Sequence, residues 1–588
     1  MDKFLDCISI EMGNAFEQAG YDRELGRVAL SNRPDLCEYQ CNGAMAGAGR
    51  YRKAPAVIAA EVAAQLSKSQ VFSEVTVVNP GFLNLRIAPA FLQTYLAEMK
   101  VTARFGLHTP EKKKKIMIDY GGPNVAKPMH VGHLRSAVIG ESVKRIIKYI
   151  GHEVISDIHL GDWGLQMGLI IWELQNRQPE LPYFQPDYEG DYPTQAPFTI
   201  TELEEIYPAA SKKSKEDENY REKAMEATLL LQSGHKGYRA LWHHILQVSV
   251  TDLKKNYDRL DVSFDLWKGE SDVHDSIEGM VQYMKENHYA YVSEGALVVD
   301  VKEESDTREI PPCMILKSDG AALYNTTDLA TIIERMKEYE PDEIIYVVDK
   351  RQELHFEQVF RCARKTKLVK EDTGLHFLGF GTMNGKDGKP FKTRDGGVLR
   401  LEYLLDEISE RMYGKIADNQ QLSAEEARRT ADMIALSALK YGDLSNQAAK
   451  DYIFDIERFI SFEGDTGPYI LYTIVRIKSI LAKYKEQGKT LEGLVLNQKM
   501  QESEKALMLS LTGFSAAIES AYEEIAPHKV CAYIYDLTNA FNHFYHQTKI
   551  LTEEDAGKQE GFIALLLLTQ SILETCIDLL GFSAPERM

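Results

Sequence analysis

The stretch 115–168 limits what this chain can fold into more than any other part of it. Residues 115–120 are apolar and short enough for a buried strand, and the glycines that follow interrupt it. Apolar residues then recur at helical spacing over 133–150, and 154–160 is a second apolar segment of strand length. The pattern predicts a strand–helix–strand unit, which is the building block of a parallel sheet.

Two histidines stand at the predicted start of that helix, in the sequence His130-Val131-Gly132-His133. A helix N-terminus offers unpaired N–H groups and a positive dipole end, which suit an anionic ligand. Gly132 would let a flat ring lie close to the backbone, and both imidazoles can donate hydrogen bonds to phosphate oxygens. Solvated histidines at a helix start are the alternative, but their place between strand and helix favours a nucleotide site.

Composition limits the class of protein. A chain of 588 residues is too long for one core, so three or four domains are expected. The longest purely apolar run, 562–568, is far short of a membrane span, and 1–20 predicts an amphipathic helix instead of a signal peptide. We therefore expect a cytoplasmic protein with no membrane partner. The net charge of −20 argues mildly against nucleic acid but leaves room for local basic patches. Cys37 and Cys41 lack a second ligand pair, so no metal site is expected.

The two ends of the chain differ in pattern. Residues 1–107 are of the α+β type, with a predicted helix over 57–66 and alternating strands over 71–78 and 81–87. Residues 456–588 are almost entirely helical in pattern and predict a bundle. Its predicted helices are 468–483, 505–525, 529–547 and 562–580.

The middle unit, 108–455, predicts a doubly wound parallel sheet, because strand-like and helical segments alternate along it. After the first strand–helix–strand unit come predicted strands at 295–301, 313–317, 343–349 and 376–381, with helices at 329–339 and 355–366. An insertion occupies about 181–260. Its first part, 181–214, is rich in proline, tyrosine and acidic residues and predicts an irregular segment, whereas 223–256 returns to helical spacing.

The residues around the two histidines, PNVAKPMHVGHLRS, resemble the signature of class I arginyl-tRNA synthetases. The resemblance spans nearly the whole chain and is weakest in 181–214. It implies a multidomain α/β protein with a Rossmann-like catalytic domain over 108–455. It also implies an N-terminal domain over 1–107 that contacts tRNA and an all-α anticodon-binding bundle over 456–588. The implied activity is an arginine–tRNA ligase, which makes arginyl-adenylate and pyrophosphate from L-arginine and ATP, then transfers arginine to the 3′ end of tRNA(Arg).

A site for arginine can be reasoned from charge. A guanidinium is planar and permanently charged, so it needs fixed carboxylates, and Asp119 and Asp328 are candidates. Tyr324 lies one helical turn before Asp328, so the two can share a helix face. The resemblance adds Asn124 and Gln352, and it implies that all five residues bind arginine.

A site for the ATP phosphates needs cations. Class I enzymes usually carry a second signature, K-M-S-K-S, but 390–394 departs from it and Thr393 stands where the catalytic lysine is usual. In the family a lysine upstream of the first histidine takes over this charge, and Lys127 holds that position. The residues expected to bind ATP are Lys127, His130, Gly132, His133, Met383 through its backbone, Lys386, Lys389 and Lys392. The expected catalytic residues are Lys127, His130, His133 and Lys392.

The resemblance also implies ligands and partners. ATP is expected as a substrate with Mg²⁺, without a tightly bound cofactor. Tyr469, Tyr472 and Arg476 share one face of a predicted helix, where aromatics and arginine can stack on unpaired bases of tRNA. Packing of the tyrosines in the bundle core is the alternative. A monomer is the expected state.

Three other interpretations were weighed. Small adenylyl- and cytidylyltransferases share an H-x-G-H motif, but the long helical end and the N-terminal unit argue against them. Cysteinyl-type synthetases share the first motif, but this chain lacks their zinc-ligand cysteines. A catalytically inactive relative that only binds tRNA would not be expected to keep Lys127, His130, His133 and Asp328.

Overall fold

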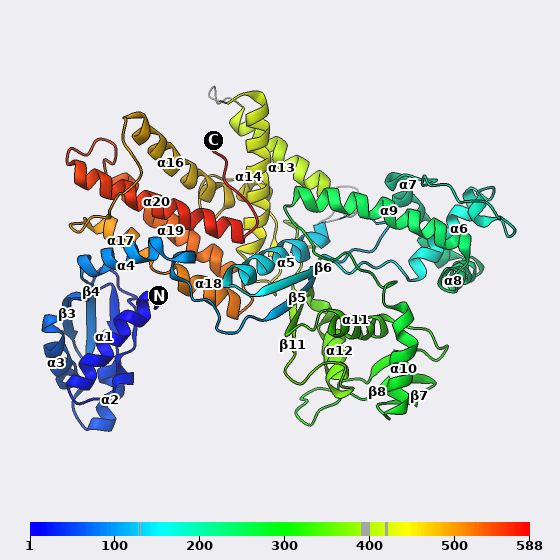
Figure 1. Cartoon of the computed structure of the whole chain (residues 1–588), viewed down its shortest axis with the longest axis horizontal. Coiled ribbons are helices and arrows are strands. Elements are labelled where there is room, and N and C mark those ends of the chain that lie inside the picture. The colour runs from blue at the N-terminus through cyan, green and yellow to red at the C-terminus, as the bar shows by residue number, and fades with distance from the viewer. Residues whose placement is uncertain (128, 130, 390–399, 418–421) are drawn as a thin grey trace.

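The computed structural model describes residues 1–127, 129, 131–389, 400–417 and 422–588. His130, Lys392 and the segment 390–394, which departs from the second signature, lie outside the described residues. The predictions made for them stay predictions. In Figure 1 the N-terminal unit lies at the lower left, the helical C-terminal unit above it, and the inserted helices at the far right.

The N-terminal unit is α+β, as predicted. Its antiparallel sheet has the order β1-β2-β4-β3 and packs against helices. The strands are β1 (Val28–Leu30), β2 (Tyr39–Cys41), β3 (Phe72–Val78) and β4 (Phe82–Ile87). The helices are α1 (Phe4–Gln18), α2 (Gly43–Tyr51), α3 (Pro55–Gln65) and α4 (Pro89–Val101).

The central sheet is parallel throughout, with the order β11-β10-β5-β6, which confirms the predicted fold class. Its strands are β5 (Lys115–Tyr120), β6 (Glu153–Asp157), β10 (Glu343–Asp349) and β11 (Gly374–Phe380). Helix α5 (Val131–Ile150) joins β5 to β6, and it ends where Gly151 adopts a φ of +117°. Helices α11 (Tyr324–Glu338) and α12 (Glu353–Lys365) flank β10 in the sequence. Because parallel strands end at the same edge, the C-terminal ends of β5 and β10 lie together.

The prediction that 295–301 and 313–317 belong to this parallel sheet is wrong. They form β8 (Ala296–Val299) and β9 (Cys313–Leu316), which join β7 (Ala290–Ser293) in a separate antiparallel sheet. The two-residue turn Glu294-Gly295 has φ values of 50° and 84°, the geometry of a tight hairpin. This turn reverses the chain at once, so β8 has to run antiparallel to β7.

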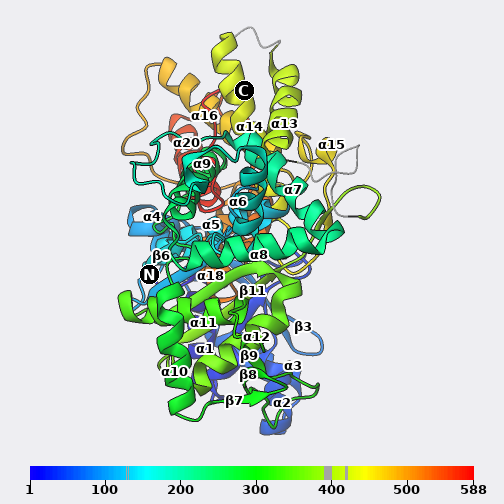
Figure 2. The same cartoon turned by 90° about the vertical axis from the view of Figure 1, so that its right-hand side faces the viewer.

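The predicted irregular character of 181–214 is wrong over its second half. Helix α7 (Ile200–Glu216) begins at Thr199, whose side chain and that of Glu202 form a capping box. Leu203 and Ile206 are buried on the inner face of this helix. The other inserted helices are α6 (Leu165–Arg177), α8 (Glu218–Gln232) and α9 (Lys236–Arg259). Figure 2 views the molecule from this end, with α6–α9 above α10 (Ile277–Glu286), α11 and α12.

The C-terminal unit is helical, as predicted. Helices α13 (Leu401–Ile416) and α14 (Ala424–Leu444) precede it in the chain. Its own helices include α15 (Ile456–Phe459), α16 (Gly467–Glu486), α17 (Glu502–Leu511), α18 (Phe514–Glu523), α19 (His528–Gln547) and α20 (Ala556–Leu579). The single helix predicted over 505–525 is two, because the chain turns at Thr512-Gly513. Within the described part of the chain, only α20 is long and apolar enough to cross a membrane, and most of it is buried in the protein core.

Candidate active site

The carboxyl edge of the parallel sheet gathers most of the predicted site. Asp119 lies near the end of β5, and Gln352 follows β10 at the start of α12. Helix α5 begins at Val131, with Gly132 exposed and His133 partly buried in its first turn. Asn124 lies in the loop between β5 and α5 and forms a bridge with Gly161, where any side chain would collide with the Asn124 amide. The β5–α5 loop is therefore fixed against the loop that follows β6.

Asp119 already has a partner inside the protein. The guanidinium of Arg335, on α11, donates to Asp119 over 2.5 Å and to Asp157 over 2.8 Å. Arg335 is only 1% exposed, so this ion pair is internal. Burial raises the pKa of Asp119, while Arg335 and His159 oppose that shift. Asp119 thus serves at least to hold α11 against the sheet, and its contact with substrate stays a prediction.

Tyr324 and Asp328 lie one turn apart at the start of α11, as predicted. Tyr324 is 72% exposed, and its ring is free to cover a ligand. Asp328 is held from the neighbouring helix α12, where His355 Nε2 lies 2.5 Å from its carboxylate. The bond leaves the second oxygen of Asp328 for a ligand and fixes the orientation of the carboxylate. Sequence analysis missed His355, because nothing local shows that α12 packs beside α11.

Glu270 is a further carboxylate of this edge that sequence analysis missed. Its peptide N–H donates to Leu160 O over 3.1 Å, where the chain at 266–269 runs parallel to the end of β6. Burial raises the pKa of Glu270 to about 7; His159 opposes the shift, and Asp162 and Asp328 increase it. Burial raises the pKa of Tyr324, and the charges of Glu270, Tyr207 and Asp328 add to that shift. The segment is too short and irregular to predict as a strand.

The lysines predicted to bind the phosphates lie in different surroundings. The Lys127 ammonium is 4.7 Å from the centre of the Tyr207 ring on α7. Lys386 pairs with Asp455 over 3.1 Å, and Lys389 is exposed. Lys127 and His133 flank the start of α5, whereas Lys386 and Lys389 follow a short strand, β12 (Met383–Asn384).

Strand β12 is anchored to helix α5. It pairs with β13 (Tyr452–Ile453) through Thr382 O and Asn384 O, so the carbonyl of Met383 points to the other side of the strand. Arg135, buried on α5, donates to Gly381 O over 2.7 Å and to Asp443 over 3.0 Å. These bonds set the backbone of Met383 relative to α5, and its contact with adenine stays a prediction.

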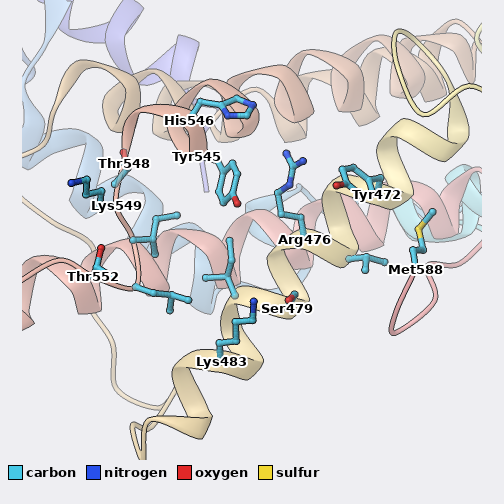
Figure 3. A pocket seen from close by; sticks show the side chains of 14 residues that line it. Tyr472, Arg476, Ser479, Lys483, Tyr545, His546, Thr548, Lys549, Thr552 and Met588 are labelled. Atoms are coloured by element: carbon cyan, nitrogen blue, oxygen red, sulfur yellow. The ribbon is translucent and has the colours of Figure 1, made fainter. Parts of the chain in front are cut away.

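A second site lies in the helical unit. A cavity of about 570 Å³ opens between α16, α19, the loop after α19 and the C-terminal Met588 (Figure 3). Arg476 lies between two rings, with its guanidinium carbon 4.7 Å from the centres of both Tyr472 and Tyr545. It also donates to Asn542 over 2.6 Å, which fixes its position. Sequence analysis missed Tyr545 because it lies on another helix, α19.

The three residues predicted to contact tRNA do not share one environment. Tyr472 and Arg476 line the cavity, and Tyr472 is 42% exposed. Tyr469 instead donates to Asn539 over 2.9 Å between α16 and α19 and does not line the cavity. The cavity adds basic side chains from Lys483 and Lys549. It therefore joins aromatic rings with positive charge, as single-stranded nucleic acid requires.

The chain matches three family descriptions. Residues 96–456 match "tRNA synthetases class I (R), catalytic domain", 470–588 match "DALR anticodon binding domain", and 6–87 match "Arginyl tRNA synthetase N terminal domain". The arginine–tRNA ligase of Agathobacter rectalis is 62% identical over 597 residues, and the match covers 100% of both chains. That of Alkaliphilus oremlandii is 54% identical over 592 residues, again covering 100% of both.

Solved structures agree in fold. The arginyl-tRNA synthetase of Plasmodium falciparum superposes with a TM-score of 0.79 at 23% identity, and that of Thermus thermophilus with 0.77 at 23% identity. Each match covers 100% of both chains, so the agreement includes all three units of the fold. With the catalytic family description covering 361 residues and relatives above half identity over their full length, the chain belongs to the family of class I arginyl-tRNA synthetases.

Proposed function

We propose that the arginine–tRNA ligase activity of this chain is carried out at the carboxyl edge of the parallel sheet, between α5 and α11. ATP activates L-arginine as arginyl-adenylate, and the arginyl group then passes to the 3′ end of tRNA(Arg). The observation that carries this assignment is the placement of Tyr324 and Asp328 one turn apart at the start of α11, with the carboxylate of Asp328 held by His355 of α12. Charging of tRNA(Arg) with arginine, and with no other amino acid, tests it; charging with lysine instead would overturn it.

The arginine end of the site is built from carboxylates and one ring. Asp328 and Glu270 would hold the guanidinium, because two carboxylates can accept its fork of N–H donors. Tyr324 would cover the aliphatic stem, and Asn124 and Gln352 would meet the α-amino and carboxylate end. Asp119 would either hold Arg335 in place next to the site or contact the substrate directly.

The ATP end is built from helix α5 and the cations. His130, Gly132 and His133 would receive the nucleotide at the helix start, with the adenine near the Met383 backbone. The arginine carboxylate attacks the α-phosphate, so no side chain has to act as nucleophile. Lys127, Lys386, Lys389 and Lys392 would strengthen their contact as pyrophosphate leaves.

Mg²⁺ would enter with ATP. Among the described residues, no three His, Cys, Asp or Glu side chains are grouped as metal ligands. The phosphate oxygens of ATP and water would therefore hold the ion, which neutralises part of the phosphate charge.

Raising the pH from 6 to 8 is expected to lower the KM for arginine about tenfold. The guanidinium of arginine is charged throughout, whereas Glu270, with a pKa of about 7, is mostly protonated at pH 6 and mostly ionised at pH 8. Affinity is therefore present above the pKa of Glu270 and lost below it. Initial rates at several pH values measure this, and Glu270→Gln should flatten the profile. A wild-type KM for arginine that does not change with pH would contradict the role given to Glu270.

The cavity in the helical unit is proposed to take an unpaired base of tRNA. Replacing Arg476 by alanine is expected to raise the KM for tRNA about tenfold, because a base stacked beside Tyr472 or Tyr545 loses its cation. Charging assays with varied tRNA measure this, and the KM values for arginine and ATP should stay within about twofold. Lys370→Ala removes an exposed charge beyond α12 and is the matched control. Equal effects of the two variants would refute the assignment.

The remaining features are proposed from the family. Units 1–107, 108–455 and 456–588 would be the tRNA-contacting, catalytic and anticodon-binding domains. The protein would act in the cytoplasm as a monomer, without a membrane partner.

A further inference from the structure

Two of the inserted helices hold Val125 and Ala126, in the segment that leads into α5. Val125 O accepts a hydrogen bond from Gln166 on α6. Ala126, which has a φ of +58°, donates from its N–H to Ser249 Oγ on α9 over 2.9 Å. A left-handed alanine is strained, so these bonds are what keep the segment in this conformation. The insertion thus holds the peptide group between Val125 and Ala126, directly before the bend that presents Lys127.

Helix α7 holds the side chain of Lys127. The ammonium lies 4.7 Å from the centre of the Tyr207 ring, within the range of a cation–π interaction. Tyr207 is itself partly buried and packs against Leu169, Ala210 and Ala224 of the inserted unit. This packing restricts the position of the ring relative to α7.

The same face of α7 is tied to the other side of the segment. Glu204, three residues before Tyr207, forms an ion pair with Arg400. The next residue, Leu401, donates its N–H to Met129 O over 3.0 Å. A closed path of contacts therefore runs from Tyr207 through Lys127 and Met129 to the start of α13 and back to Glu204. The path holds Lys127 from both its side chain and its backbone.

The chemical nature of the group beside the Lys127 ammonium matters as much as the position of the ammonium. Within the described ranges of the chain, no carboxylate lies within ion-pair distance of Lys127, although carboxylates pair with Lys386 and many other cations. A carboxylate would neutralise the ammonium, whereas a ring face orients it and leaves its charge for an anion. The ammonium is thereby oriented by the protein and still available to a phosphate.

We propose that Tyr207 is a positioning residue for Lys127, and that the inserted unit α6–α9 sets this lysine in place for the phosphates of ATP. The inference rests on the proposed role of Lys127 in adenylate formation. It gives the insertion a function in the reaction, since α7 lies outside the parallel sheet.

A double-mutant cycle on Tyr207 and Lys127 tests this. Tyr207→Met, Lys127→Ala and the double variant are compared by arginine-dependent ATP–pyrophosphate exchange in the presence of tRNA. Tyr207→Met should lower the exchange rate about fivefold in the wild-type background and by less than about 1.5-fold in the Lys127→Ala background. Tyr207→Phe, which keeps the ring face, should retain the rate within about twofold, and the KM for arginine should not change. Tyr413→Leu, which removes the ring beneath Arg428 at 5.6 Å, is the matched control.

The outcomes separate this inference from the role of Lys127 itself. Wild-type exchange by Lys127→Ala would overturn both the proposed role and the inference. Slow exchange by Lys127→Ala, together with an equal effect of Tyr207→Met in both backgrounds, would overturn the inference alone, because Tyr207 would then be purely structural. If Tyr207→Met does not fold, phenylalanine and trifluorophenylalanine at position 207 are compared instead. The two rings have similar shapes, but fluorine weakens the negative potential of the ring face. Equal rates for these two variants would also overturn it.

Discussion

Replacing Asp328 by asparagine raises the KM for arginine at least ~100-fold, whereas the KM for ATP changes by less than about twofold. Asparagine keeps the shape of the side chain and its contact with His355 on α12, so the loss is one of charge. A guanidinium placed against a neutral amide is left partly unpaired, which costs about 3 kcal/mol in a site shielded from water. Exchange kinetics with either substrate varied measure the two constants.

A matched control for Asp328→Asn is Glu278→Gln, which removes an exposed carboxylate from the first turn of α10. It should leave both constants at their wild-type values. Equal losses of affinity for arginine and for ATP in Asp328→Asn would mean that Asp328 holds α11 to α12 and does not bind substrate.

Replacing Lys127 by alanine slows the formation of arginyl-adenylate at least ~10-fold, which is about 1.4 kcal/mol of transition-state stabilisation. The physical reason is that negative charge develops on pyrophosphate as it leaves, and a cation must stabilise it. Thr393 stands where the second signature usually has its catalytic lysine, so another lysine has to supply that charge. Single-turnover adenylate formation measures the step directly, apart from transfer to tRNA.

The matched control for Lys127→Ala is Lys148→Ala, at the far end of α5, which removes an exposed ammonium from the same part of the chain. It should form adenylate at the wild-type rate. An unchanged rate in Lys127→Ala would contradict the account and would transfer the role to Lys386, Lys389 or Lys392.

The elements that sequence predicted well are those whose signals are local. Helix α5 was predicted over 133–150 from its period, and the structure places its start at Val131 and its end at Ile150. Helix α7 was missed although its signal was present, since Thr199 and Glu202 have the spacing of a capping box. Its proline and its acidic residues outweighed the few apolar positions that face the core.

What the sequence could not provide is which elements meet. An apolar strand has the same pattern in a parallel or an antiparallel sheet, so β8 and β9 were assigned to the wrong one. The contacts of the site residues could not be predicted for the same reason. His355 reaches Asp328, and the ring of Tyr207 lies beside the ammonium of Lys127, only because distant helices pack together.

Amino-acid-dependent ATP–pyrophosphate exchange, measured with each of the twenty amino acids and with or without tRNA(Arg), tests the central claim most directly. The account predicts exchange with L-arginine alone, and only when tRNA is present. Exchange with a different amino acid, or no exchange with any of them, would contradict it.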